Sequence, residues 1–158
     1  MIEIKAPNAF ADAPRPWVFL CGSIEMGAAE NWQQRLVRSC GEVPGTILNP
    51  RRDDWDSSWE QSSDNPQFFN QVVWELQAQE LADLILVYFD PSTKSPITLL
   101  ELGLFRYRPM TVCCPKGFWR KGNVDIVCAR YGIRQVQTIE DMADYVSCFL
   151  SAGLAARP

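Results

Sequence analysis

Short apolar runs alternate along this chain with segments in which apolar residues recur at helical spacing. These runs predict strands at 17–21, 46–49, 84–89 and 110–114, and we expect a fifth short strand at 134–137. The segments between and after them predict five helices, over 28–40, 67–82, 97–105, 121–131 and 139–150. Regular alternation of strand and helix is typical of an α/β fold, so we expect a three-layer, Rossmann-like arrangement around a parallel sheet of about five strands.

The length of the chain sets the expected domain organisation. Its 158 residues suffice for one domain with a substantial core, and no repeat or interdomain linker interrupts them. We therefore expect a single domain over 1–158, with the Pro- and Ala-rich residues 1–16 as an N-terminal arm or edge segment. The N-terminus has no signal-peptide pattern, and the longest apolar stretch, at 84–89, is too short to cross a bilayer.

Charge and composition exclude several classes of function. The net charge is −4 and the sequence pI is about 4.8. That balance argues against binding to a nucleic-acid polymer or an anionic membrane, although it permits a small anionic substrate held by local arginines. Histidine is absent, so Ser-His-Asp and Cys-His catalysis and histidine-containing metal sites are impossible within the chain.

The six cysteines favour a reducing compartment. None belongs to a C-x-x-C motif, and two of them are adjacent, at 113 and 114. This spacing indicates neither a zinc site nor a disulfide framework. We expect reduced, mostly buried thiols in a cytoplasmic protein that holds no metal.

Glu101 is the leading candidate for chemistry. It is the one carboxylate in the apolar run 97–105, and a helical reading places it on the inward stripe with Ile97, Leu100 and Leu104. A bare buried carboxylate is costly, so such a group is usually paired, protonated or used in catalysis. The residues alone leave open a functional carboxylate or a satisfied core ion pair.

Glu75 is the second candidate. It lies on the 67–82 helix, just off a face that carries Phe69, Val72, Val73 and Leu76. Taken alone it is an ordinary solvated glutamate. Beside Glu101 in one crevice it would form the kind of carboxyl pair that glycosyl-transfer chemistry uses.

Two loops at strand ends are expected to contact substrate. Gly22 and Ser23 follow the first strand and form either a plain tight turn or a backbone cradle. In the 49–59 loop, Arg51 or the next arginine could contact a base edge or phosphate, and Trp55 or the second tryptophan could stack on a base. Asp53, in the same loop, is also expected to bind substrate. The alternative is a self-paired surface loop.

Three further polar residues lie near the ends of strands. Asp90 follows the third strand, and Ser95 precedes the Glu101 helix, where it either caps the helix or also contacts substrate. Asn123 lies in a polar corner and is read by default as a turn residue. In parallel sheets, ligands bind beyond the carboxyl ends of strands, which favours Asp90 and Ser95 as substrate-binding residues.

Five segments occur in a familiar order: 19–24, 49–52, 74–76, 82–85 and 95–103, the last ending in Glu101-Leu102-Gly103. In this order they resemble the nucleoside 2-deoxyribosyltransferase family and its nucleotide N-glycosidase relatives. The resemblance covers roughly residues 17–150. Its most specific parts are the Glu-Leu-Gly element and the separation of Glu75 from Glu101, 101 − 75 = 26.

The resemblance implies a flavodoxin-like parallel sheet, no cofactor, and a glutamate nucleophile that forms a glycosyl-enzyme ester. By this resemblance Glu101 attacks the anomeric carbon, and Glu75 matches an acidic residue near sugar and base that is usually aspartate. Asn123 resembles an asparagine that a neighbouring subunit lends to the sugar 5′ end, so a homo-oligomer is implied. Asp83 matches a structural acid.

A nucleophilic Glu101 on a buried helix face stays ionised only if it is hydrogen-bonded there, and Tyr88 and Ser95 are the candidate donors. The expected function is therefore cleavage or exchange of the N-glycosidic bond of a (deoxy)nucleoside or its monophosphate. The expected partners are the small-molecule nucleoside or nucleotide and a free nucleobase. Two alternatives remain open at this point. One is a non-catalytic module that binds a nucleotide, and the other is a glycosidase of NAD or of a modified nucleoside.

Overall fold

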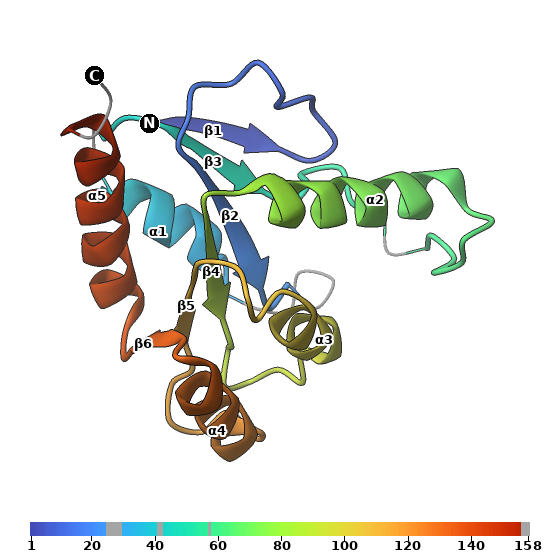
Figure 1. The fold of residues 1–158 in the computed structure, drawn as a ribbon. Coiled ribbons are helices and arrows are strands. Elements are labelled where there is room, and N and C mark those ends of the chain that lie inside the picture. Colours follow the sequence, from blue (N-terminus) through green and yellow to red (C-terminus); the bar gives the residue numbers. More distant parts are fainter. Residues whose placement is uncertain (25–29, 41–42, 57, 156–158) are drawn as a thin grey trace.

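A computed structural model describes residues 1–24, 30–40, 43–56 and 58–155 of the chain (Figure 1). The described residues form six strands: β1 (Ile2–Lys5), β2 (Trp17–Gly22), β3 (Thr46–Asn49), β4 (Leu84–Tyr88), β5 (Met110–Cys113) and β6 (Arg134–Val136). They also form five helices: α1 (Trp32–Cys40), α2 (Pro66–Leu81), α3 (Pro96–Leu104), α4 (Lys121–Tyr131) and α5 (Ile139–Ala155). The α/β alternation predicted from the sequence is confirmed.

All six strands are parallel, in the order β1-β3-β2-β4-β5-β6. The sequence predicted about five strands, and the additional one is β1, which lies in the N-terminal arm and pairs with β3 at the sheet edge. Without β1 the order is that of a flavodoxin-like sheet. The chain reverses its direction of winding between β2 and β4, and such a switch point is where this class of sheet binds ligands.

The arm is fastened to the sheet by a structural carboxylate. Asp83, directly before β4, accepts hydrogen bonds from the Arg15 guanidinium at 2.8 Å and from the Trp17 backbone N–H at 2.7 Å. Asp83 stands at the amino end of β4, away from the carboxyl ends of the strands. Its contacts therefore fit a structural acid.

Helices cover both faces of the sheet, as Figure 1 shows. On one face, α1 and α5 pack over alternate strand residues, with Trp32, Leu36, Met142 and Val146 fully buried. On the other face lie α2, α3 and α4, packed over Phe19, Ile85 and other residues of opposite orientation. Because side chains alternate along a strand, Cys21 at the end of β2 points to the α2–α3 face.

Two helices present different faces to the sheet from those predicted. On α3, Ile97, Leu100 and Leu104 are exposed, and Thr98 and Leu102 are buried instead. On α2, Phe69 is exposed and the buried residues are Gln71, Trp74, Ala78 and Gln79. Apolarity alone misassigned the inward stripes because both helices turn polar side chains toward the sheet.

Other local features agree with the sequence. Asn65 caps α2, its side-chain oxygen accepting from the backbone N–H groups of Gln67 and Phe68. The helix predicted from residue 28 begins at Trp32, and residues 28 and 29 lie outside the described residues. None of the helices formed by the described residues is long and apolar enough to cross a bilayer.

Candidate active site

The Glu101 carboxyl is held between three elements. From the end of β2, the Cys21 thiol donates to Glu101 Oε2 at 3.1 Å. From α2, the Gln79 amide donates to Glu101 Oε1 at 2.6 Å. Each oxygen thus has a donor on a different element, and the Glu101 side chain still keeps part of its surface exposed. The carboxyl is fixed in orientation beside the switch point between β2 and β4.

Opposing effects set the pKa of Glu101, and burial and charge together set that of Cys21. Burial raises the pKa of Glu101, while the hydrogen bonds from Cys21 and Gln79 act in the opposite direction. Burial, followed by the negative charge of Glu101, raises the pKa of the Cys21 thiol well above its ordinary value. Cys21 therefore stays protonated and serves as a donor to the carboxylate.

The second carboxyl belongs to a polar stripe on α2. Gln71, Glu75 and Gln79 are four residues apart, so they share one side of the helix. Gln71 donates from one Nε2 to Glu75 Oε1 at 2.8 Å and to the Pro50 carbonyl at 2.9 Å. Through Gln71 and Gln79, this side of α2 contacts both Pro50 in the 49–59 loop and the Glu101 carboxyl.

The two predicted carboxyls lie close enough that, besides burial, the charge of Glu101 raises the pKa of Glu75. Burial raises the pKa of Glu75 to about 7, and the charge of Glu101 adds to the rise against the hydrogen bond from Gln71. Glu75 is thus poised to carry or release a proton near neutral pH. The amide oxygens of Gln71 and Gln79 are enclosed and have no hydrogen-bond partner among the described residues.

Sequence reasoning missed the two donors to Glu101. It proposed Tyr88 and Ser95 as supports for the carboxylate. The supports are instead Cys21 and Gln79, and Tyr88 packs against Trp32 on the opposite face of the sheet. The four-residue spacing of Gln71, Glu75 and Gln79 was the available signal for a polar helix face.

Three buried hydroxyls gather where β2 and β4 end. Ser23 Oγ lies 2.5 Å from Ser95 Oγ and 3.0 Å from Thr93 Oγ1, and Thr93 Oγ1 lies 2.7 Å from Ser95 Oγ. Ser95 has the left-handed backbone conformation, with φ of 47°, and its side chain makes no capping hydrogen bond to α3. The cap predicted for Ser95 is therefore wrong as a side-chain contact.

Asp90 joins this hydroxyl cluster from the end of β4. Its backbone N–H donates to Ser23 Oγ at 3.0 Å, and its carboxylate accepts from the Ser92 hydroxyl and N–H. Burial opposes ionisation, but the bonds from Ser92 and from the Glu30 N–H hold the pKa of Asp90 below its usual range. Asp90 is therefore a charged group beside neutral hydroxyls.

Gly22 is required by close packing. It is the last residue of β2, and a Cβ there would lie 2.5 Å from the Tyr88 carbonyl oxygen and 2.8 Å from the Trp32 ring. The Ser23 N–H already donates to the Tyr88 carbonyl at 3.1 Å. The backbone cradle considered at Gly22-Ser23 therefore has no free N–H at Ser23.

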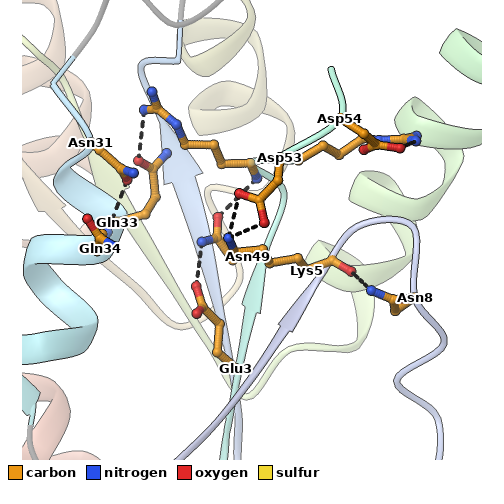
Figure 2. Close-up of polar contacts among 11 residues, drawn as sticks. Glu3, Lys5, Asn8, Asn31, Gln33, Gln34, Asn49, Asp53 and Asp54 are labelled. Carbon is orange, nitrogen blue, oxygen red and sulfur yellow. Dashed lines mark hydrogen bonds and ion pairs between the residues drawn. The ribbon is translucent and has the colours of Figure 1, made fainter. Parts of the chain in front are cut away.

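The 49–59 loop is largely paired within itself and with its neighbours. Figure 2 shows Asp53 beside Lys5, which it meets in an exposed ion pair at 2.7 Å. The Arg51 guanidinium donates to the Glu30 carbonyl and to Gln33 Oε1, each at 3.4 Å. Trp55 packs edge-on against Trp59. These contacts fit the self-paired alternative for Asp53 and Trp55.

Asn123 lies apart from this group. It is exposed in the first turn of α4, and its backbone N–H donates to the Arg120 carbonyl. Among the described residues, one set of contacts holds the carboxyls of Glu101 and Glu75 and a second set joins Ser23, Asp90 and Ser95, and neither set involves Asn123.

Comparison with known proteins identifies one family. A family model described as nucleoside 2-deoxyribosyltransferase like matches residues 15–118, more than half of the chain. The matched region contains Glu75, Glu101 and the hydroxyl cluster, and it ends before Asn123. A search of curated proteins found no match.

Proposed function

Because the chain belongs to the nucleoside 2-deoxyribosyltransferase-like family, we propose that it cleaves or exchanges the N-glycosidic bond of a (deoxy)nucleoside or nucleoside monophosphate. The observation that carries the proposal is the Glu101 carboxyl, held by Cys21 and Gln79 at the switch point of the sheet, with Glu75 beside it. An oriented carboxylate and a carboxyl with a pKa near 7 supply the two roles that this reaction needs.

In the first step, a Glu101 oxygen attacks the anomeric carbon of the sugar. The bond from that carbon to the base nitrogen breaks, its electron pair leaves with the base, and a glycosyl ester of Glu101 forms. Glu75 donates its proton to the departing base and becomes a carboxylate. Carboxylates stabilise the oxocarbenium-like transition state of such a displacement.

In the second step, water or another nucleobase attacks the same carbon. The ester bond to Glu101 breaks, Glu101 regains its carboxylate, and Glu75 takes up the proton that the incoming group loses. Water gives the free sugar, and a base gives a new nucleoside. The cycle consumes neither an oxidant nor a cofactor.

The other residues of the site take supporting roles in this proposal. Cys21 and Gln79 orient Glu101 and favour its ionised form. The hydroxyl cluster of Ser23, Thr93 and Ser95, with Asp90, binds the sugar end of the substrate.

We assign Asn123 to a shared site. The resemblance to the family implies that it serves the sugar 5′ end of a neighbouring copy, and its exposed position on α4 is compatible with that role. This role requires a homo-oligomer. Gly22 serves by permitting the close packing of β2, and Arg51 by closing the crevice near Gln33.

A substrate panel tests the proposed reaction. Purified protein is incubated with nucleosides, deoxynucleosides and their monophosphates, with NAD included, and released base is followed by chromatography. We expect base release from at least one substrate, and a loss of about 10³-fold or more in Glu101→Gln, which keeps the shape of the side chain. The exposed α2 variant Glu80→Gln is the matched control.

Release that survives unchanged in a folded Glu101→Gln would refute the assignment of the nucleophile. Saturable binding without release from any member of the panel would replace the enzyme by a nucleotide-binding module. Release from NAD alone would keep the mechanism and change the substrate.

A further inference from the structure

A depression lies at the opposite end of the sheet from the Glu101 site. It has a volume of about 500 Å³ and is bounded by the first residues of β4, β5 and β6. Its charged and aromatic walls are Arg106, Arg108, Arg134, Tyr107, Tyr131 and Tyr145. The amino ends of the strands are not used by the proposed reaction, so this depression needs a separate explanation.

The three arginines are not neutralised by carboxylates. Arg106 donates to the Gly103 carbonyl at 2.7 Å, and Arg108 donates to the Ala82 carbonyl at 2.8 Å. Within the described ranges, no ion pair joins any of the three to an acidic side chain, and no acidic residue lines the depression. A protein of net charge −4 thus carries a local concentration of positive charge here.

Aromatic rings lie against two of these guanidinium groups, those of Arg106 and Arg134. The Arg106 guanidinium lies 4.3 Å from the centre of the Tyr107 ring and 5.2 Å from that of Tyr131. The Arg134 guanidinium lies 4.6 Å from the centre of the Tyr145 ring. Stacking fixes the plane of a guanidinium. Arg106 also donates to the Tyr107 hydroxyl at 3.4 Å, whereas Arg134 is exposed and presents the edge of its guanidinium to an anion.

Two of the rings are open to solvent. Tyr107 is 76% exposed and Tyr131 is 42% exposed, and they meet edge to face with centroids 5.7 Å apart. Exposed tyrosines beside unpaired arginines offer planar surfaces for stacking together with donors for a phosphate.

We propose that this depression binds a nucleotide, with its phosphate on the arginines and its base against Tyr107 or Tyr131. A volume of about 500 Å³ is in the ordinary range for small-molecule sites. The overall negative charge disfavours a nucleic-acid polymer, whose many phosphates would need a longer basic surface. The site is separate from Glu101, and its occupancy does not depend on the reaction proposed there.

The test uses a nucleotide that an N-glycosidase cannot cleave. Formycin A 5′-monophosphate joins base to sugar through a carbon–carbon bond, so it reports binding alone. It is titrated into ¹⁵N-labelled full-length protein while the backbone amides of 106–108 and 131–134 are followed by NMR. The variants are Arg134→Gln and Tyr107→Ala, both at exposed positions, and Arg130→Gln is the matched control outside the depression.

We expect saturable shifts at these amides with a dissociation constant below about 1 mM, weakened about tenfold or more in Arg134→Gln and in Tyr107→Ala and unchanged in Arg130→Gln. Formycin A without its phosphate, and inorganic phosphate alone, should each bind more weakly than the nucleotide. Shifts confined to residues 21–24 and 90–101, or equal responses of all three variants, would overturn the proposal. Neither result would affect the reaction proposed for Glu101.

Discussion

Gln79 is, with Cys21, one of the two donors that favour the ionised form of the Glu101 carboxyl against the effect of burial. Its amide gives the shorter of the two hydrogen bonds to that carboxyl, at 2.6 Å. In Gln79→Leu we expect the acidic limb of the pH–rate profile to move to higher pH, because an unassisted buried carboxyl ionises less readily. A hydrogen bond to a charged group is worth roughly 1.5–3 kcal/mol, so kcat/KM should fall about 10–100-fold.

The matched control for this prediction is Gln77→Leu, at an exposed position of the same helix. It should leave both the rate and the profile unchanged. A folded Gln79→Leu enzyme with the wild-type pH profile would show that Gln79 does not act on the protonation of Glu101.

Glu75 should make the stability of the protein fall as pH rises. Burial raises its pKa from an ordinary 4.5 to about 7 in the folded state, so between these values the native protein holds a proton that the unfolded chain has lost. The stabilisation is complete below about pH 4.5 and is lost as pH rises through about 7. It amounts to at most about 3 kcal/mol and is reduced by the partial exposure of the side chain.

Chemical denaturation from pH 5 to pH 8 measures this effect. The free energy of unfolding of Glu75→Gln should decline less with pH than that of the wild type, and above pH 7 the variant should be the more stable protein. The chain has no histidine to mask the transition. Identical slopes for wild type and Glu75→Gln would contradict the raised pKa, and Glu80→Gln provides the surface control.

The two carboxyls were predictable from the sequence, and the groups that hold them were not. Glu101 is conspicuous because it is charged within an apolar run. Cys21 and Gln79 are ordinary core-compatible residues, and they reach Glu101 across separations of 80 and 22 residues. Only the packing of β2, α2 and α3 brings their donors to the carboxyl oxygens.

Among the elements, α2 and α3 show where hydrophobic patterning fails. The apolar stripe Ile97–Leu100–Leu104 was predicted to face inward, but these side chains are 60%, 64% and 55% exposed. The helix does turn Glu101 toward the sheet, as predicted, but the buried residues beside it are Thr98 and Leu102.

The exposed face of α3 leads to a prediction about assembly. Three large apolar side chains on one helix face mark a surface suited to burial against another copy of the chain. We expect an oligomer by light scattering, and Leu100→Glu should shift it toward the monomer because the charge would be buried at the interface. The control Gln77→Leu on α2 should not. A monomeric wild type would contradict the shared role proposed for Asn123.

At the scale of the whole molecule, the order of elements was readable because the central strands are short, largely apolar runs bounded by a turn or a helix. The predicted boundaries of β3 and α4 agree with the structure, and most others differ by one or two residues. β1 was not predicted as a strand, since Ile2–Lys5 alternates apolar and charged residues over only four positions. Residues 2–5 form a strand because they pair with β3 at the sheet edge, a contact that the sequence pattern does not reveal.

The central claim is that Glu101 carries the sugar covalently between two half-reactions. The most direct measurement is the intact mass of the protein, quenched with acid during turnover of the nucleoside and nucleotide panel without an added acceptor base. The account predicts a pentosyl-sized adduct on the wild type, located by peptide mapping to α3, and its absence in Glu101→Ala. An adduct of the same size in Glu101→Ala, or base release by the wild type with direct inversion at the anomeric carbon and no adduct, would contradict it.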